Sequence, residues 1–294
     1  MSGVDPVIEC SQVMDNIVKI VAVSVLLLAG CGDDVYTEQQ PDANKMHVAI
    51  TRSSESGFSN GDRVGLFVVY SGEVHYNNVD LRYDYSRLTW CPSVNIYWKD
   101  AATPADLYCY YPYNKGLCSL YNSLKWSVAN QSSIDSYRSS DVLLGCAKGV
   151  SPTNETVGIQ VAHAMSHLVV KLKAGNGLNQ EDIAGAGVEI CNVNTEASIN
   201  VGEQKVSATE EVGVIKPLFS DGQYCANVVP CRVDNKELVR ITIGDKEYSL
   251  NQTIVFEPGK EYICTITLSM SDQGVNIGIT DWITQTKDYG GVVW

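Results

Sequence analysis

Cys31 has the most specific chemical setting of the reactive side chains in this sequence. It follows residues 20–30, an apolar run that reads IVAVSVLLLAG, with Lys19 in front of it. Spanning a bilayer takes about 20 apolar residues, so this run is too short for a membrane helix. A basic residue, a short apolar stretch and small residues at its end are typical of a secretory signal peptide. Because those small residues lead directly into cysteine, LAGC at 28–31 resembles a lipobox, and we expect lipid, such as palmitate, on Cys31.

Residues 1–30 are therefore predicted to be a lipoprotein signal peptide. The alternatives are an ordinary signal peptide followed by a chance cysteine, or a buried core segment. Asp5 and Glu9 stand where a signal peptide carries positive charge. Translation from Met14 would give a signal of ordinary length, so we expect residues 1–13 not to belong to the natural protein.

Residues 57–61 read GFSNG and match the G-x-S-x-G pattern of a serine nucleophile. A nucleophile elbow joins a strand to a helix, whereas this match lies between two expected strands and follows the polar residues SSES. A plain turn is the better interpretation. We predict no catalytic residue here, and no enzyme.

His163 and His167 have the i, i+4 spacing of a helical metal site. On a strand, however, residues four apart are separated by about 13 Å, which is too far for both to bind one zinc ion. The glutamate of the H-E-x-x-H motif is also missing, since Ala164 stands beside His163. No phosphate-binding glycine loop occurs either, so we expect no metal, cofactor or nucleotide.

The charge of the chain excludes a further class of partner. Its 294 residues carry a formal net charge of −13 at pH 7, while 45% of them are hydrophobic. A phosphate backbone is repelled by such a surface, so nucleic acid is not expected as a partner.

Eight cysteines remain when Cys10 and Cys31 are set aside, and they allow 105 disulfide pairings. None has the C-x-x-C spacing of a redox or zinc site. Cys109 and Cys264 alternate with apolar neighbours along expected strands, where cysteine behaves as a small hydrophobic residue. We predict mostly reduced core thiols, with Cys225 and Cys231 as the pair most open to a disulfide.

Most of the chain has the pattern of β-strands separated by glycine, asparagine and aspartate turns. RVGLFVVY at 63–70 is apolar on both faces and predicts a central strand, whereas LVVKLKA at 168–174 alternates and predicts burial on one face. Only LNQEDIAGAG could form a helix, and a short one. Many short strands predict an all-β sandwich architecture, and the length after residue 30 suggests two sandwiches in series.

The aromatic residues are expected mainly in the core. Trp90, Trp98 and Trp126 fall close together, and the runs YYPY and NIYW alternate with apolar neighbours. An exposed aromatic surface that stacks on sugars or anchors a protein partner is the alternative.

A set of short motifs occurs in a characteristic order along the chain. ITR at 50–52 and F-x-x-G-D at 58–62 run into RVGLFVVY, and YYPY at 110–113, HAMSHLVVKL at 163–172, EYICTITL and a late ITDW follow. In this order, behind a lipobox, they resemble the fimbrillin-like family, the lipoprotein subunits of type V pili in anaerobic Gram-negative bacteria.

The resemblance implies two transthyretin-like β-sandwich domains, with HAMSHLVVKL near their junction. We expect a linker at 31–45, an N-terminal domain at 46–160 and a C-terminal domain at 161–294. It also implies a surface-exposed subunit of a fimbrium at the outer membrane. Asp33 and Asp34, which follow the expected lipidated cysteine, resemble a signal for export to the cell surface.

Two functions remain open. The first is a structural or adhesive pilus subunit, which binds other subunits by inserting a strand from one into a groove of the next. The second is a surface lipoprotein of the outer membrane that does not polymerise and binds glycan or host protein.

The resemblance gives Arg52 a specific role. It implies that an arginine-directed protease cuts between Arg52 and Ser53, removing the lipid and the first expected strand, HVAIT at 47–51, together. We expect the polar residues after Arg52 to be exposed and open to proteolysis. The alternative is that Arg52 is a solvated loop residue and that Cys31 anchors the protein permanently.

Overall fold

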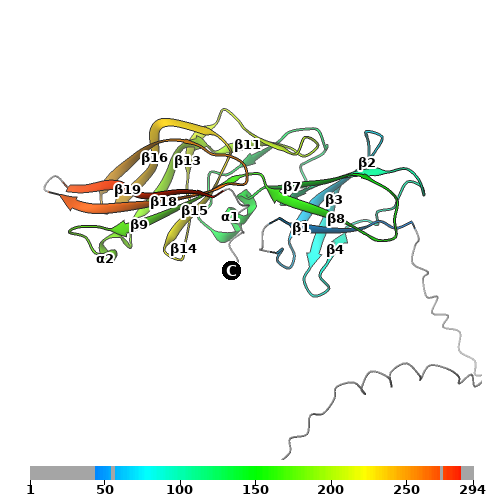
Figure 1. The fold of residues 1–294 in the computed structure, drawn as a ribbon, viewed down its shortest axis with the longest axis horizontal. Coiled ribbons are helices and arrows are strands. Elements are labelled where there is room, and N and C mark those ends of the chain that lie inside the picture. Colours follow the sequence, from blue (N-terminus) through cyan, green and yellow to red (C-terminus); the bar gives the residue numbers. More distant parts are fainter. Residues whose placement is uncertain (1–43, 54–56, 272–273, 286–294) are drawn as a thin grey trace, which may run out of the picture. The chain divides into compact units, whose positions relative to one another are not determined.

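The computed structural model describes residues 44–53, 57–271 and 274–285. These residues form nineteen β-strands and two short helices, α1 (Ile134–Ser140) and α2 (Gln180–Ile183) (Figure 1). The prediction of an all-β fold is confirmed, and α2 is the short helix expected in LNQEDIAGAG. Helix α1 was not predicted, because its sequence IDSYRSS has no apolar periodicity. A capping box between Ser133 and Ser136 starts it.

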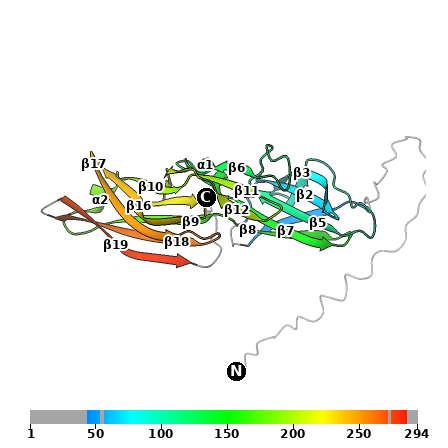
Figure 2. The same ribbon diagram turned by 90° about the horizontal axis from the view of Figure 1, so that it is seen from above.

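The largest sheet has seven strands, and several of them can be followed side by side in Figure 2. In spatial order they are β1 (His47–Arg52), β8 (Thr156–His163), β7 (Leu143–Val150), β5 (Ala105–Tyr111), β2 (Arg63–Tyr70), β3 (Glu73–Asp84) and β4 (Thr89–Pro92). Only the β1–β8 pair in this sheet is parallel. Strand β2 is buried from Val64 to Tyr70, which confirms the prediction of a central strand.

Three smaller sheets contain the other described strands. The first has the order β13 (Val212–Ile215), β10 (Gly187–Asn194), β16 (Arg232–Ile243) and β17 (Lys246–Val255). The second has the order β12 (Lys205–Ala208), β11 (Glu196–Asn200) and β6 (Leu124–Ser127). The third has the order β14 (Leu218–Ser220), β15 (Gln223–Val228), β9 (Ser166–Ala174), β18 (Glu261–Ser271) and β19 (Gly274–Gln285).

Strand β9 differs from its prediction. The predicted pattern, with only one face buried, is found only in the second half of the strand, where Lys171 and Lys173 point to solvent. In the first half Leu168 and Val170 lie in the main core, and Val169 on the opposite face is also buried, against Tyr137 of α1. The unpredicted helix is the reason, since it covers a face that would otherwise meet water.

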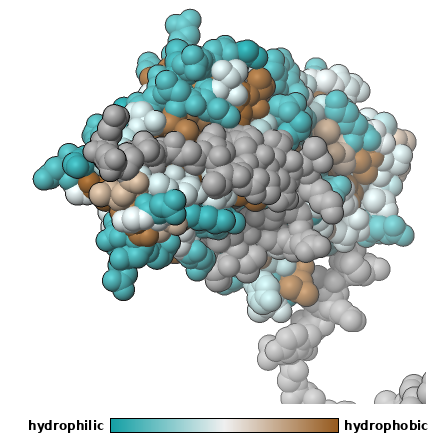
Figure 3. Space-filling model, turned by 60° about the vertical axis from the view of Figure 1, so that its left-hand side comes forward, coloured by the Kyte–Doolittle hydropathy of each residue, from teal (hydrophilic) through white to brown (hydrophobic). Residues whose placement is uncertain are grey.

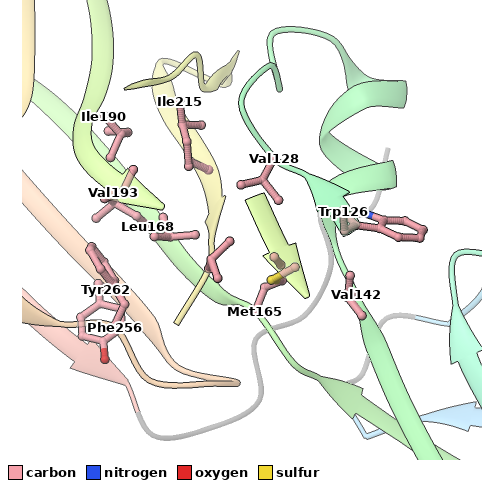
Figure 4. Packing of buried hydrophobic residues seen from close by; sticks show 14 of the residues in the cluster. Trp126, Val128, Val142, Met165, Leu168, Ile190, Val193, Ile215, Phe256 and Tyr262 are labelled. Carbon is pink, nitrogen blue, oxygen red and sulfur yellow. The ribbon is translucent and has the colours of Figure 1, made fainter. Parts of the chain in front are cut away.

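The domain boundary expected near residue 160 falls inside β8. Strand β6, from the first half of the chain, pairs with β11 from the second half. One large core also joins Trp126, Val128 and Val142 to Met165 and Leu168 (Figure 4). All the described residues fall within one compact unit, so the division into domains at 46–160 and 161–294 stays a prediction.

Buried polar side chains concentrate around α1, beside β15 and the start of β9. Asn227 and Gln131 are both fully buried. The Gln131 side-chain amide donates to the Asn227 carbonyl at 2.7 Å, and the Asn227 backbone N–H donates to Gln131 Oε1 at 2.8 Å. The Asn227 amide also donates to the Tyr137 carbonyl at 3.1 Å and to Ser140 Oγ at 3.0 Å. A buried amide is costly unless it is hydrogen-bonded, so these bonds hold α1 in one position.

Two histidine–carboxylate pairs complete this region. His163 Nδ1 lies 2.8 Å from Asp141 Oδ1, and His167 Nδ1 lies 2.9 Å from Glu261 Oε2. Burial alone raises the pKa of Asp141, but His163 outweighs it and the net pKa is lowered. The hydrogen bond from His167 lowers the pKa of Glu261 against the opposing effect of burial. Both carboxylates are therefore stabilised in their charged form.

Acid should destabilise the protein through these carboxylates. A carboxyl with a lowered folded-state pKa stabilises the fold above its unfolded pKa, and this contribution is lost as pH falls through the folded pKa. We expect the free energy of unfolding to decrease below about pH 4, near the ordinary carboxyl range. Asp141→Asn should flatten that dependence in denaturant titrations from pH 3 to 7, whereas Asp245→Asn at an exposed turn should not. An unchanged acid dependence in Asp141→Asn would contradict this.

The eight cysteines of the described residues are all free, which agrees with the predicted thiols and leaves Cys225 and Cys231 unjoined. Cys109 and Cys264 are fully buried, as expected from their strands, but Cys91 and Cys118 are exposed and do not belong to the core. Burial raises the pKa of Cys225 to about 11 and that of Cys264 to about 12. Trp90, Trp98 and Trp126 are buried, which confirms core packing for the tryptophans. On the face drawn in Figure 3, the hydrophobic residues that reach the surface form separate patches among hydrophilic ones.

Thiol reactivity should divide these cysteines into two classes. Since the thiolate is the reactive form, Cys91 and Cys118 should be labelled quickly by a maleimide in the native protein. Cys109, Cys225 and Cys264 should react only after unfolding. Peptide mapping at successive times measures this, and Cys91→Ser is the control for assignment. Rapid labelling of Cys264 in the native state would show that the core is wrongly assigned.

Candidate functional site

Strand β1 lies at one edge of the seven-stranded sheet and is held by three kinds of contact. It pairs in parallel with β8, with His47 opposite Thr156 and Arg52 opposite Val161. Just before it, the Met46 N–H donates to Ile96 O at 2.8 Å. The indole of Trp90 donates to the Ile50 carbonyl at 3.0 Å.

The faces of β1 follow the sequence pattern. Ile50 is buried and Val48 is half-buried, while His47 and Thr51 on the other face are exposed. Ile50 belongs to the core of the seven-stranded sheet, together with Val157 and Ile159 of the neighbouring strand β8. Removal of β1 would therefore uncover apolar side chains and leave one edge of β8 unpaired, while β7 would still pair with its other edge.

A cavity of about 600 Å³ is lined by residues of β1 and β4, the two outer strands of the same sheet. Both strands contribute to its lining, which mixes apolar side chains with polar ones and with the basic residues Lys45 and His47. The lining residues are Lys45, Met46, His47, Val48, Ala49, Leu81, Leu88, Thr89, Trp90, Cys91, Pro92, Asn95, Ile96 and Thr156. Unpaired backbone groups at sheet edges can accept an additional strand.

Arg52 ends β1 with its side chain only 10% exposed. The guanidinium carbon lies 4.6 Å from the centre of the Phe58 ring and 5.2 Å from that of Tyr111. Its Nη2 is 4.0 Å from Asp62 Oδ2, and its Nε has no hydrogen-bond partner within the described part of the chain. The alternative that Arg52 is a solvated loop residue is therefore wrong. Ser53, in contrast, is exposed, as expected.

Asp62 connects the groups around Arg52. Its Oδ2 accepts the Ser59 N–H at 2.7 Å, and its Oδ1 accepts the Tyr111 hydroxyl at 3.4 Å. Burial, and then the nearby Asp62 charge, raise the pKa of Tyr111, so its phenol stays neutral and able to donate. Phe58 packs edge-on against Trp90, with ring centres 4.8 Å apart. Sequence reasoning did not predict this pocket, although Phe58 and Asp62 were noted as parts of one motif.

The G-x-S-x-G match forms a turn before β2, as predicted. Asp62 N–H donates to the Ser59 carbonyl at 3.0 Å, and Gly61 has a φ of +87°, which glycine adopts without strain. Ser59 therefore lies in no strand-to-helix elbow.

His163 and His167 do not share a strand, contrary to expectation. His163 ends β8 and His167 lies in β9, because the chain passes from one sheet to another between them. Each faces a carboxylate, and His167 Nε2 also lies 2.9 Å from the Tyr137 hydroxyl. No group of three or more metal-binding side chains occurs among the residues that the structure describes.

The predicted lipid-attachment residue, Cys31, lies outside the described residues, as do the signal peptide and the candidate start at Met14. Within the described ranges, no helix has both the length and the apolarity needed to cross a bilayer.

Residues 51–282 match the model of the family described as "Fimbrillin-like". A Bacteroides uniformis protein named "Putative fimbrium subunit Fim1C" is 25% identical over 289 residues, covering 88% of this chain and 92% of its own. A crystal structure of a "putative cell adhesion protein" from Bacteroides uniformis has a TM-score of 0.69 at 21% identity, covering 84% of this chain and 99% of that one. One with the same description from Bacteroides ovatus has a TM-score of 0.67 at 18% identity, covering 85% and 98%.

The structural matches establish the fold, and the family match spans both β1's end and the pocket around Arg52. They agree with the motifs noted in the sequence and with the expectation of a non-enzymatic fimbrial or adhesion subunit. The chain belongs to the fimbrillin-like family.

Proposed function

We propose that this protein is a subunit of a cell-surface fimbrium, assembled by strand exchange after β1 is removed. One observation carries the proposal: an edge strand that covers core residues ends at Arg52 and is followed directly by the exposed Ser53. A cut at that bond would separate β1 and everything before it from the remaining fold.

Removing β1 would cost enough folding free energy that its replacement by another strand is favourable. Met46 and Ile50 are each 3% exposed, and burying such a side chain stabilises a fold by about 1.5–3 kcal/mol. Removing both, together with the ladder to β8, costs an amount comparable with a typical total stability of about 5–15 kcal/mol. A strand from another subunit would restore both the apolar contacts and the backbone hydrogen bonds.

Export and anchoring are part of the same proposal. Lipid on Cys31 would hold the new subunit at the outer membrane, and cleavage after Arg52 would release it to the fimbrium. Its partners are then other pilus subunits, and a surface ligand on a host or another bacterium where the subunit is adhesive. We also propose that the subunit consists of two domains, at 46–160 and 161–294.

The burial of Arg52 favours a second candidate. A subunit whose cleavage-site arginine is only 10% exposed could keep its first strand and its lipid. It would then be a surface lipoprotein of the outer membrane that binds glycan or host protein without polymerising.

Replacing Arg52 separates the two candidates. Arg52→Lys keeps a positive charge but removes the site for an arginine-directed protease, so cells making it should lose polymers while the monomer stays folded and lipidated. Detergent-stable ladders on gels and immunogold labelling measure this, with Arg87→Lys in an exposed turn as the matched control. Polymers of normal length in Arg52→Lys would exclude cleavage at this bond as the activating step.

Lipidation can be tested independently. Cys31→Ser should abolish incorporation of a clickable palmitate analogue and move the precursor from the detergent phase to the aqueous phase. Cys91→Ser is the control, because it removes an exposed cysteine far from the expected lipid site. Undiminished labelling of Cys31→Ser would rule out Cys31 as the lipid site.

A further inference from the structure

We propose that the Arg52 side chain is a latch, which keeps the Arg52–Ser53 bond closed to proteases until β1 has loosened. The inference rests on the proposed function, because it assigns the regulation of the same bond. The latch consists of Arg52 and the three side chains around it, Phe58, Asp62 and Tyr111.

Both sides of the bond are engaged in the folded chain. An arginine-directed protease must accommodate the guanidinium in its own pocket, but here it stacks on Phe58 and Tyr111 with 10% of the side chain exposed. On the other side, the Ser53 N–H donates to Val161 O at 2.9 Å and so continues the β1–β8 ladder. Exposure of the Ser53 side chain is therefore not sufficient for cleavage, and the chain has to open locally first.

The latch and the strand depend on the same aromatic cluster. Phe58, which stacks on Arg52, packs 4.8 Å from Trp90, whose indole donates to the Ile50 carbonyl of β1. Displacing Phe58 would release the guanidinium and disturb the support of the Ile50 backbone together. Loosening of β1 and exposure of its cleavage site are thus coupled, so a protease cuts chains whose first strand is already leaving the sheet.

Asp62 fixes the direction of the guanidinium. It is held in place by the Ser59 N–H and the Tyr111 hydroxyl, and its Oδ2 lies 4.0 Å from Arg52 Nη2. A planar guanidinium suits this position better than an ammonium, because it can stack on rings and face a carboxylate at once. The same pocket would hold lysine less tightly.

Trypsin digestion of the purified full-length chain under native conditions tests the latch, with Arg87 as an internal standard. The Arg87 side chain is 76% exposed and lies in a turn of the same sheet. Mass spectrometry of early time points gives the ratio of cleavage at Arg52–Ser53 to cleavage at Arg87–Leu88. In the wild type this ratio should be below about one tenth, since proteolysis follows the population of the open form.

Phe58→Leu and Asp62→Asn should each raise that ratio about tenfold, the effect of losing one partly desolvated cation contact. Arg52→Lys should raise it too, because the pocket holds lysine less tightly and trypsin still cuts after lysine. Asp80→Asn, which breaks the Arg63–Asp80 pair in the same sheet, is the matched control and should leave the ratio unchanged. Two variants at different positions guard against one that folds poorly, which circular dichroism would reveal.

Equal wild-type rates at the two bonds, or ratios unaffected by Phe58→Leu and Asp62→Asn, would overturn the latch. Those results would leave strand exchange untouched, because it is judged by polymers in cells. Conversely, polymers that do not require Arg52 would refute the proposed function, while the trypsin ratios would still decide whether the latch exists.

Discussion

A strand edge that is both apolar and unpaired is unstable in water, and β1 removes this instability from the seven-stranded sheet. It gives β8 a parallel ladder partner and places Ile50 over the core formed with Val157 and Ile159. Parallel pairing at an edge needs no tight turn between the two strands, so β1 comes from a distant part of the chain. Because β1 is an edge strand that belongs to no hairpin, it could leave the sheet without disrupting the pairing of the other strands.

The position of β8 depends in turn on the polar region around α1. The chain leaves the seven-stranded sheet at His163 and enters the five-stranded sheet at Ser166. His163 pairs with Asp141 at the end of α1, while Asn227 of β15 holds the same helix through Tyr137 and Ser140. Such buried polar contacts tolerate few alternative arrangements, since each unsatisfied group is costly. These contacts fix the residue at which β8 ends, and thereby the register in which β1 pairs with β8.

The sequence was sufficient to predict what depends on local pattern. Strand β2 is apolar on both faces and is central, and the glycine-containing turn at Ser59 was recognised from its residue types. It was insufficient where distant segments meet. Helix α1 is polar and is stabilised by a cap and by Asn227, which lies 90 residues from Tyr137 in the sequence. The second buried face of β9 follows from that helix, so both were missed together.

Arg52 illustrates the same limit at the candidate site. Its neighbours in sequence are polar, which favours exposure, but its neighbours in space are Phe58, Tyr111 and Asp62. A guanidinium can be buried against rings because it is weakly hydrated and planar, a property that no local pattern reveals. The same burial that protects the bond also ties its arginine to the cluster holding β1. In the proposed strand exchange β1 must be stable before assembly and removable during it. One opening event at the Arg52 cluster would then both expose the proposed cleavage site and weaken the strand.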